Sequence, residues 1–427
     1  MPLSALLVSL AVAACASGPE AYVEGRGYAG KYAGDPVFRA AVARVVGARQ
    51  AALAQVADLL GLRARDPSRI TVEFRDALPT GTDPLHRVTE GPFQTRTEGG
   101  LDSRVRVVIH TEALVSGEYD LEEALAHEMA HAVLRERMSG PEYRRVPVWL
   151  LEGLAVHAAG QEEQILRCSL VTLLEPGGLD RLLPGLGRAE HTFDHYAQDA
   201  LAVRYLVETA GPGAPRALTL RLAAGEPPRE ALTAVAGAPY AEFLRRADTF
   251  SRERLLASRP PEWPQVERLS ALHRGGEHAA LRAEAEGFLA RHPRSAYAPE
   301  VLGWHANACR RLGDPEAAEA SLRRALAGFP RATCSGWDGV WFQLGTVLLA
   351  RGDPDGAARC LETVLRDHPG TTIQDAALLE LARAELARGD PLAALARLEL
   401  LGRSYPAGPF AAAAARLRAE VEAVVTR

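Results

Sequence analysis

Five residues, from His127 to His131, have the types and spacing best suited to metal binding and catalysis. They read His-Glu-Met-Ala-His. Their neighbours favour a helix, and two histidines four positions apart on a helix lie on one face, one turn from each other. Two imidazoles in that arrangement can bind one metal ion. Glu128 is offset around the helix, where it can reach a water molecule beside the metal. The pattern therefore predicts a metal centre with a general base next to it.

A third ligand is expected from a second helix, because a catalytic zinc binds three protein ligands and keeps one position open. The segment from Pro147 to Ala155 predicts such a helix, and Glu152 is its one charged residue. An unpaired carboxylate is costly to bury, so Glu152 needs a cation. The 20 residues between His131 and Glu152 are enough for a loop and a return. Two imidazoles and one carboxylate favour zinc among the divalent metals.

Residues from about 70 to 250 resemble the gluzincin zinc metallopeptidases, in particular the bacterial peptidase MA-like domains. The resemblance rests on the HExxH pattern at 127–131 and on the Pro-x-Trp-x-x-Glu-Gly pattern at 147–153. It also includes the later segment that begins Tyr196-Ala197-Gln198. The resemblance implies a hydrolase that cleaves peptide bonds.

The resemblance also implies a role for each site residue. His127, His131 and Glu152 would bind one catalytic Zn2+ ion, and Glu128 would activate a zinc-bound water as catalytic acid and base. In gluzincins a tyrosine or histidine downstream of the third ligand stabilises the oxyanion, and Tyr196 is the first candidate for this role.

Three histidines are further candidates for the oxyanion donor: His191, His195 and His157. One departure from the gluzincin pattern concerns the support of the metal-binding histidines. Several gluzincins carry an acidic residue four positions after the glutamate ligand, where this chain has Val156. The supporting hydrogen bond must therefore come from elsewhere, with Glu123 as a candidate, or be weaker.

Other elements are expected around these residues. Apolar spacings of three and four predict a helix from Asp35 to Leu62, and residues 70–74 alternate as a half-buried strand does. Residues 105–110 read as a second strand, and the resemblance implies that it edges the substrate cleft and pairs with an extended peptide. The expected fold class is α+β, a gluzincin-like metallopeptidase domain followed by an all-α tetratricopeptide-like helical solenoid.

The solenoid is expected from internal repeats beyond residue 264. Four glycines, spaced 37 to 39 residues apart, are each followed by a proline 17 positions later, and small residues recur near three of them. This pattern resembles tetratricopeptide repeats and covers about 265 to 406. The four pairs are Gly276 with Pro293, Gly313 with Pro330, Gly352 with Pro369, and Gly389 with Pro406.

The N-terminus predicts a secreted, lipid-anchored protein. The apolar run from Leu3 to Ala14 fits a signal peptide, and Val12-Ala13-Ala14-Cys15 resembles the lipobox of bacterial lipoproteins, in which Cys15 carries the lipid. Residues 16–34, rich in glycine and alanine, read as a flexible tether. The expected location is the bacterial cell envelope, at the outer membrane and facing the periplasm.

Composition sets outer limits on the function. The chain has 427 residues, which suggests two or three domains, and a net charge of −5, which argues against a nucleic-acid partner. Five cysteines exclude a dense disulfide scaffold. Cys168 stands outside the repeats, while Cys309, Cys334 and Cys360 could form a disulfide or remain buried thiols.

These observations divide the chain into a signal peptide over residues 1–15, a tether over 16–34, a zinc metallopeptidase domain over 35–258 and a repeat domain with a C-terminal cap helix over 259–427. The leading interpretation is a membrane-anchored zinc-dependent peptidase whose repeats recruit a partner or substrate protein. The alternative is a non-enzymatic envelope scaffold that acts through its repeats.

Overall fold

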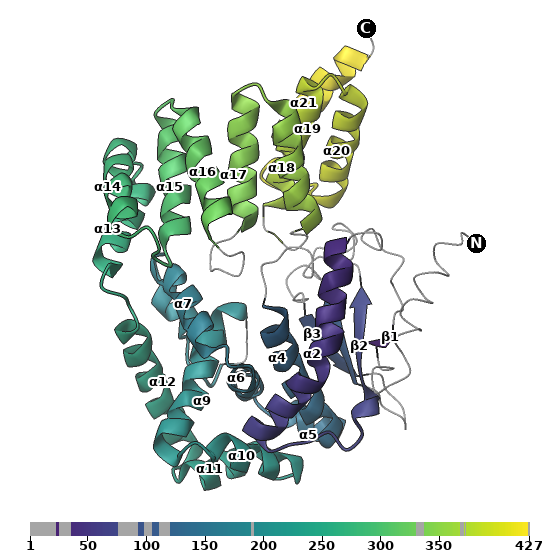
Figure 1. Cartoon of the computed structure of the whole chain (residues 1–427), viewed down its shortest axis with the longest axis vertical. Helices are drawn as coiled ribbons and strands as arrows, with labels where there is room; N and C mark the ends of the chain where they lie inside the picture. The colour runs from purple at the N-terminus through teal and green to yellow at the C-terminus, as the bar shows by residue number, and fades with distance from the viewer. Residues whose placement is uncertain are drawn as a thin grey trace, which may run out of the picture. The chain divides into compact units, whose positions relative to one another are not determined.

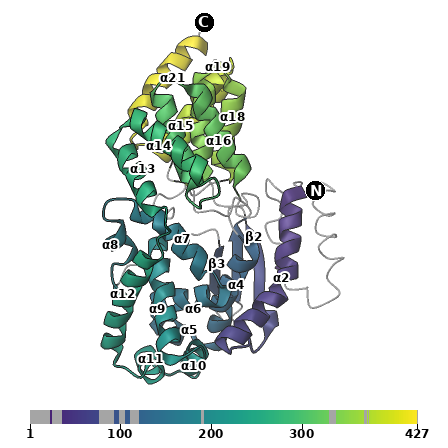
Figure 2. The same cartoon turned by 60° about the vertical axis from the view of Figure 1, so that its left-hand side comes forward.

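The computed structural model describes residues 23–24, 36–75, 93–97, 105–110, 120–188, 192–329, 337–367, 371 and 373–425. The described residues form two compact units, one ending at Pro260 and the other beginning at Pro261 (Figures 1 and 2). The signal peptide, Cys15 and most of the tether lie outside the described residues. No helix among those described combines the length and apolar character needed to cross a membrane.

Helices dominate both units, so the α+β class predicted from the sequence, with its gluzincin-like domain, is wrong. The described residues contain nineteen α-helices and one sheet of four strands, each of two to six residues. The two predicted strands are present, but they add little to a core made chiefly of packed helices.

The sheet formed by the described strands has the order β1-β2-β4-β3. β2 pairs in parallel with β1 and with β4, whereas β4 and β3 are antiparallel. Thr71 and Glu73 of β2 are buried like the apolar residues with which they alternate, so this strand is covered on both faces instead of being half-buried. The strands are β1 (Val23–Glu24), β2 (Ile70–Arg75), β3 (Phe93–Thr97) and β4 (Val105–His110).

β4 is an inner strand, which corrects a second expectation. Its backbone groups pair with β2 on one side and with β3 on the other, with Val107 opposite both Val72 and Thr95. The strand predicted to edge a substrate cleft therefore has no side left for a peptide. β3 is the outermost strand on that side of the described sheet.

The first unit is built on packed helices. α4 packs against the sheet, α2 and α6, and α6 packs in turn against α9, as Figure 1 shows. Leu125, Met129 and Leu154 are among the large side chains that this packing buries completely. The helices of this unit are α2 (Pro36–Leu60), α4 (Leu121–Arg137), α5 (Gly140–Arg145), α6 (Val148–Ala159), α7 (Glu162–Leu173), α8 (Gly178–Leu182), α9 (Tyr196–Ala210), α10 (Ala214–Ala223), α11 (Pro228–Ala236) and α12 (Tyr240–Ala257), with short 3-10 turns η1 (Pro67–Arg69) and η3 (Phe193–His195).

The second unit is a row of helical hairpins, and the repeats predicted from the sequence are confirmed. All four glycines of the repeat pattern adopt positive φ angles of 69° to 80°, which end the first helix of each hairpin. Asp314 and Asp390 then cap the following helices through Ala317 N and Ala393 N. The helices are α13 (Trp263–Gly275), α14 (His278–Arg291), α15 (Ala298–Arg311), α16 (Pro315–Gly328), α17 (Trp337–Ala350), α18 (Pro354–Asp367), α19 (Gln374–Ala387), α20 (Pro391–Ser404) and α21 (Ala411–Val425).

Candidate metal centre

Three side chains from α4 and α6 converge in the first unit. Nε2 of His127 lies 3.2 Å from Oε2 of Glu152, and Nε2 of His131 lies 3.3 Å from the same oxygen. The two Nε2 atoms are themselves 3.3 Å apart. Among the described residues, these three form the one group of histidine, cysteine and acidic side chains close enough to hold a metal ion.

The separations suit a small divalent cation. Ligand atoms placed tetrahedrally at about 2.0–2.1 Å from a zinc ion are about 3.3 Å from one another. Both imidazoles are buried, and the carboxylate is mostly buried as well. Three electron-rich atoms in mutual contact, away from solvent, are stable only with a positive charge among them. His127, His131 and Glu152 therefore fit zinc in chemistry and in spacing.

The local backbone explains how these ligands meet. Asp120 caps α4 by accepting hydrogen bonds from Glu122 N and Glu123 N, and this sets the helical turn that aligns the two histidines. α6 begins directly after Pro147 and lies beside α4, so Glu152 faces that turn. The spacing of four within α4 agrees with what the sequence predicts, whereas the return expected as a loop contains a short helix, α5.

The charge of Glu152 has the largest raising effect on the pKa of the neighbouring His131. Burial lowers the pKa of His131, but the nearby carboxylate of Glu152 outweighs this and raises it to about 10. Burial acts to raise the pKa of Glu152, but the two histidines hold it well below its usual range. The site therefore strongly favours positive charge between an ionised carboxylate and the two rings.

Each imidazole has a hydrogen-bond partner on its far nitrogen. Nδ1 of His127 lies 2.9 Å from Oε1 of Gln161, and Nδ1 of His131 lies 3.4 Å from the hydroxyl of Tyr143. These partners differ from Glu123, the candidate that the sequence offers. Burial and the charge of Asp120 raise the pKa of the Glu123 carboxyl. The signal that could have indicated Gln161 is the Gly160-Gln161 pair that follows the apolar helix.

Glu128 lies next to the ligands on α4 and is buried. Its charge contributes to raising the pKa of both His131 and Tyr196. A carboxylate beside His127 on α4 is of the type that accepts a proton from water in hydrolysis.

Tyr196, the first residue of α9, is brought to the same place. Its ring centroid lies 5.9 Å from that of His127. Burial, followed by the charges of Glu152 and Glu128, raises the pKa of Tyr196 well above its usual value. The phenol therefore stays protonated at neutral pH and can donate a hydrogen bond.

The other candidate donors are placed differently. Nδ1 of His195 accepts hydrogen bonds from Nε of Arg188 at 2.9 Å and from Thr192 N at 3.0 Å, so this ring belongs to a separate network. His157 is five residues after Glu152, which is about 140° around α6. Burial and the charge of Arg204 lower the pKa of His157. His191 lies outside the described residues.

Gly153 allows α9 to approach α6, the helix that carries Glu152. A Cβ atom at this position would lie 2.4 Å from the carbonyl oxygen of Asp199 and 2.7 Å from Cγ2 of Val203. Only glycine leaves room for such close contact between α6 and α9. The glycine of the Glu-Gly pair therefore explains how Tyr196 reaches the ligands.

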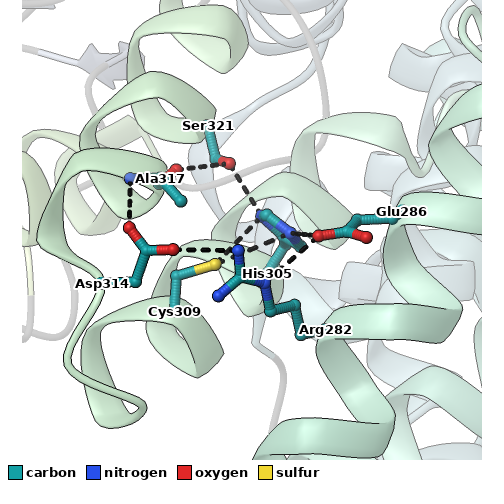
Figure 3. A network of polar contacts seen from close by, with 7 residues as sticks. All are labelled: Arg282, Glu286, His305, Cys309, Asp314, Ala317 and Ser321. Atoms are coloured by element: carbon teal, nitrogen blue, oxygen red, sulfur yellow. Dashed lines mark hydrogen bonds and ion pairs between the residues drawn. The ribbon is translucent and has the colours of Figure 1, made fainter.

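A second cluster of reactive side chains lies in the repeat unit (Figure 3). His305 places Nδ1 2.8 Å from the Ser321 hydroxyl and Nε2 3.4 Å from Oε1 of Glu286. Sγ of Cys309 lies 3.6 Å from Nε2 of His305, but burial raises the pKa of this thiol. A buried, un-ionised thiol is a poor nucleophile, so we assign this cluster no catalytic role. Its hydrogen bonds join side chains of α14, α15 and α16.

Two of the cysteines considered for a disulfide are buried free thiols in the structure. These are Cys309 and Cys360. Cys334 lies outside the described residues. Burial also raises the pKa of Cys360 to about 11, so its thiol stays protonated at neutral pH.

Comparison with known proteins adds to the second unit. Residues 340–371 match the tetratricopeptide repeat. The matched segment runs through α17 and α18, which form one of the hairpins. No curated protein matches the chain. Since tetratricopeptide repeats mediate contacts between proteins, the second unit acts in protein–protein interaction and has a protein partner.

Proposed function

We propose that the chain is a zinc-dependent hydrolase of peptide bonds whose repeats recruit the partner or substrate protein. The observation that carries this proposal is the 3.2–3.3 Å convergence of Nε2 of His127, Nε2 of His131 and Oε2 of Glu152. The ligand set also resembles that of the gluzincins, although the fold class expected with it does not hold. The repeat match supports the recruiting role.

A zinc ion bound by these ligands would polarise a substrate carbonyl and activate water for attack. The carboxylate of Glu128 would accept a proton from the attacking water and deliver it to the leaving amine nitrogen. The protonated hydroxyl of Tyr196 would donate a hydrogen bond to the carbonyl oxygen as negative charge develops there. Because all three ligands are largely buried, bulk water would have little access to the metal.

A peptide substrate is supported by the sheet. β3 is its outermost described strand on one side and contacts α4, the helix that carries Glu128. An extended peptide added to that outer side would form main-chain hydrogen bonds that do not depend on sequence. Selectivity would then depend largely on what the repeats recruit.

A non-enzymatic scaffold is the second candidate, and the repeat match favours it as much as it favours the peptidase. The two differ in what they require of the first unit. A scaffold has no use for two histidines and a glutamate grouped at metal-binding distances, whereas the peptidase requires them. Metal content therefore separates the two functions.

We also propose that the chain is anchored in the bacterial envelope through a lipid on Cys15, on the strength of the Val12–Cys15 pattern. A Cys15→Ser variant is expected to leave the membrane fraction of cells. Retention of this variant in the membrane would contradict the anchor and would leave the proposed chemistry untouched.

The first experiment measures zinc in the full-length chain and in a His127→Ala variant, with His157→Ala as a matched control outside the ligand set. About one zinc per chain is expected in the first and third proteins and none in the second. Wild-type protein that takes up no zinc after reconstitution would overturn the proposed peptidase and favour the scaffold.

A further inference from the structure

The turn after α6 carries a side chain back to the metal ligands. α6 ends at Gly160, which has a positive φ of 75°, and the next residue, Gln161, donates its backbone N–H to the carbonyl of Val156 at 3.2 Å. The carbonyl of Gln161 accepts from Ile165 N at 2.9 Å. The residue is therefore held at both backbone groups, at the junction of α6 and α7.

The side chain of Gln161 makes a contact that selects one form of His127. Its Oε1 lies 2.9 Å from Nδ1 of His127. An amide oxygen accepts hydrogen bonds and cannot donate them, so the proton of the neutral imidazole lies on Nδ1. The lone pair of Nε2 then faces Glu152 and His131.

We propose that Gln161 is a positioning residue that fixes the tautomer and ring orientation of His127 and thereby sets the metal affinity of the site. This inference rests on the proposed zinc centre. The position four residues after Glu152 cannot serve this purpose, because Val156 is apolar and fully buried. Gln161, which follows the C-terminal end of α6, makes the hydrogen bond to His127 instead.

Tyr143 does not duplicate this role at the other histidine. Its hydroxyl lies 3.4 Å from Nδ1 of His131, which is longer than the contact of Gln161 by half an ångström. A hydroxyl can donate or accept, so it does not choose between the two tautomers. His127 is therefore the ligand whose form depends on a single neighbour.

The amide of Gln161 also affects how strongly the imidazole of His127 donates electrons to a metal. A carboxylate behind a metal-binding imidazole makes the ring a stronger electron donor, whereas a neutral amide orients the ring with less effect on its basicity. Replacing Gln161 with glutamate should therefore keep the orientation and strengthen metal binding. Replacing it with leucine should remove both the proton acceptor and the orientation.

The test measures the affinity of the full-length chain for Zn2+ by competition with a coloured chelator. Gln161→Leu is expected to weaken binding about 10- to 100-fold, and Gln161→Glu to bind at least as tightly as the wild type. Gln164→Leu, the same replacement one turn further along α7, is the matched control and should bind like the wild type. Thermal unfolding in excess chelator checks that all four proteins fold equally well.

Two outcomes would overturn the inference. Equal affinity of Gln161→Leu and wild type would show that the contact does not control the ligand. Equal weakening in Gln161→Leu and Gln164→Leu would show a general effect of α7. Both results require a wild type that binds zinc, so they differ from failure of the proposed function, in which the wild type itself binds none.

Discussion

Nε2 of His127 and Nε2 of His131 lie 3.3 Å apart inside the protein, each within 3.3 Å of one carboxylate oxygen of Glu152. Without metal, a proton on His131 supplies positive charge beside Glu152, because the carboxylate outweighs burial and raises the pKa of this histidine to about 10. A divalent cation would displace that proton and interact with all three atoms at once. A ligand that binds only the folded protein stabilises it, so the stability of the first unit should depend on metal.

Removing the metal is expected to lower the melting temperature of the wild-type chain. A ligand present at 1,000 times its dissociation constant stabilises the native state by about 4 kcal/mol, and a strong chelator abolishes that contribution. The measurement is calorimetry with and without chelator. In the His131→Ala variant the chelator should have little effect, and a large shift in that variant would point to metal bound elsewhere.

Glu128→Gln should separate catalysis from metal binding. The amide has nearly the same shape but cannot take up a proton, so kcat should fall about 10²- to 10⁴-fold. Zinc content should stay at the wild-type value, because Glu128 is not among the three ligands. The check is hydrolysis of a peptide library beside metal analysis of the same sample. Undiminished hydrolysis by the variant would remove Glu128 from the mechanism.

The grouping of His127, His131 and Glu152 could be predicted from the sequence because each position depends on a local rule. The i,i+4 spacing of His127 and His131 fixes their common face once α4 forms, and the lone charge of Glu152 in an apolar helix indicates its need for a cation. Gln161 could not be found in this way. Its contact depends on the positive φ of Gly160 and on the packing of α6 beside α4, neither of which spacing alone determines.

The fold class failed for a related reason. The strands at 70–75 and 105–110 formed where the alternation and the apolar run predicted them. How many strands join a sheet depends on distant pairings. Within the described part of the chain the sheet has four strands, while α2, α4, α6 and α9 build the core. The repeats were predictable because each hairpin is a local unit that is marked by its own glycine, Gly313 for example.

Tyr196→Phe tests the oxyanion donor. The loss of a single donor of this type reduces kcat about 10²- to 10³-fold, and KM should change little, since the hydrogen bond strengthens only as charge develops. Because burial and two carboxylates hold the pKa of Tyr196 well above its usual value, activity should not be lost near pH 10 through ionisation of this group. Steady-state kinetics across pH check both points. A variant with unchanged kcat would leave the oxyanion role to another group.

Gly153→Ala should damage the packing that brings Tyr196 to the ligands. The added methyl group would meet the Asp199 carbonyl oxygen at 2.4 Å, so α9 must move away from α6. Overpacking of this kind costs about 1–3 kcal/mol, and kcat should fall along with stability. Gly47→Ala, in the middle of α2, is the matched control, since nothing lies within 4 Å of its added methyl group. That control should gain about 0.5–1 kcal/mol from the better helix former. Calorimetry measures the free energy of unfolding of both variants. A Gly153→Ala protein as stable as Gly47→Ala would show that α6 and α9 do not pack this closely.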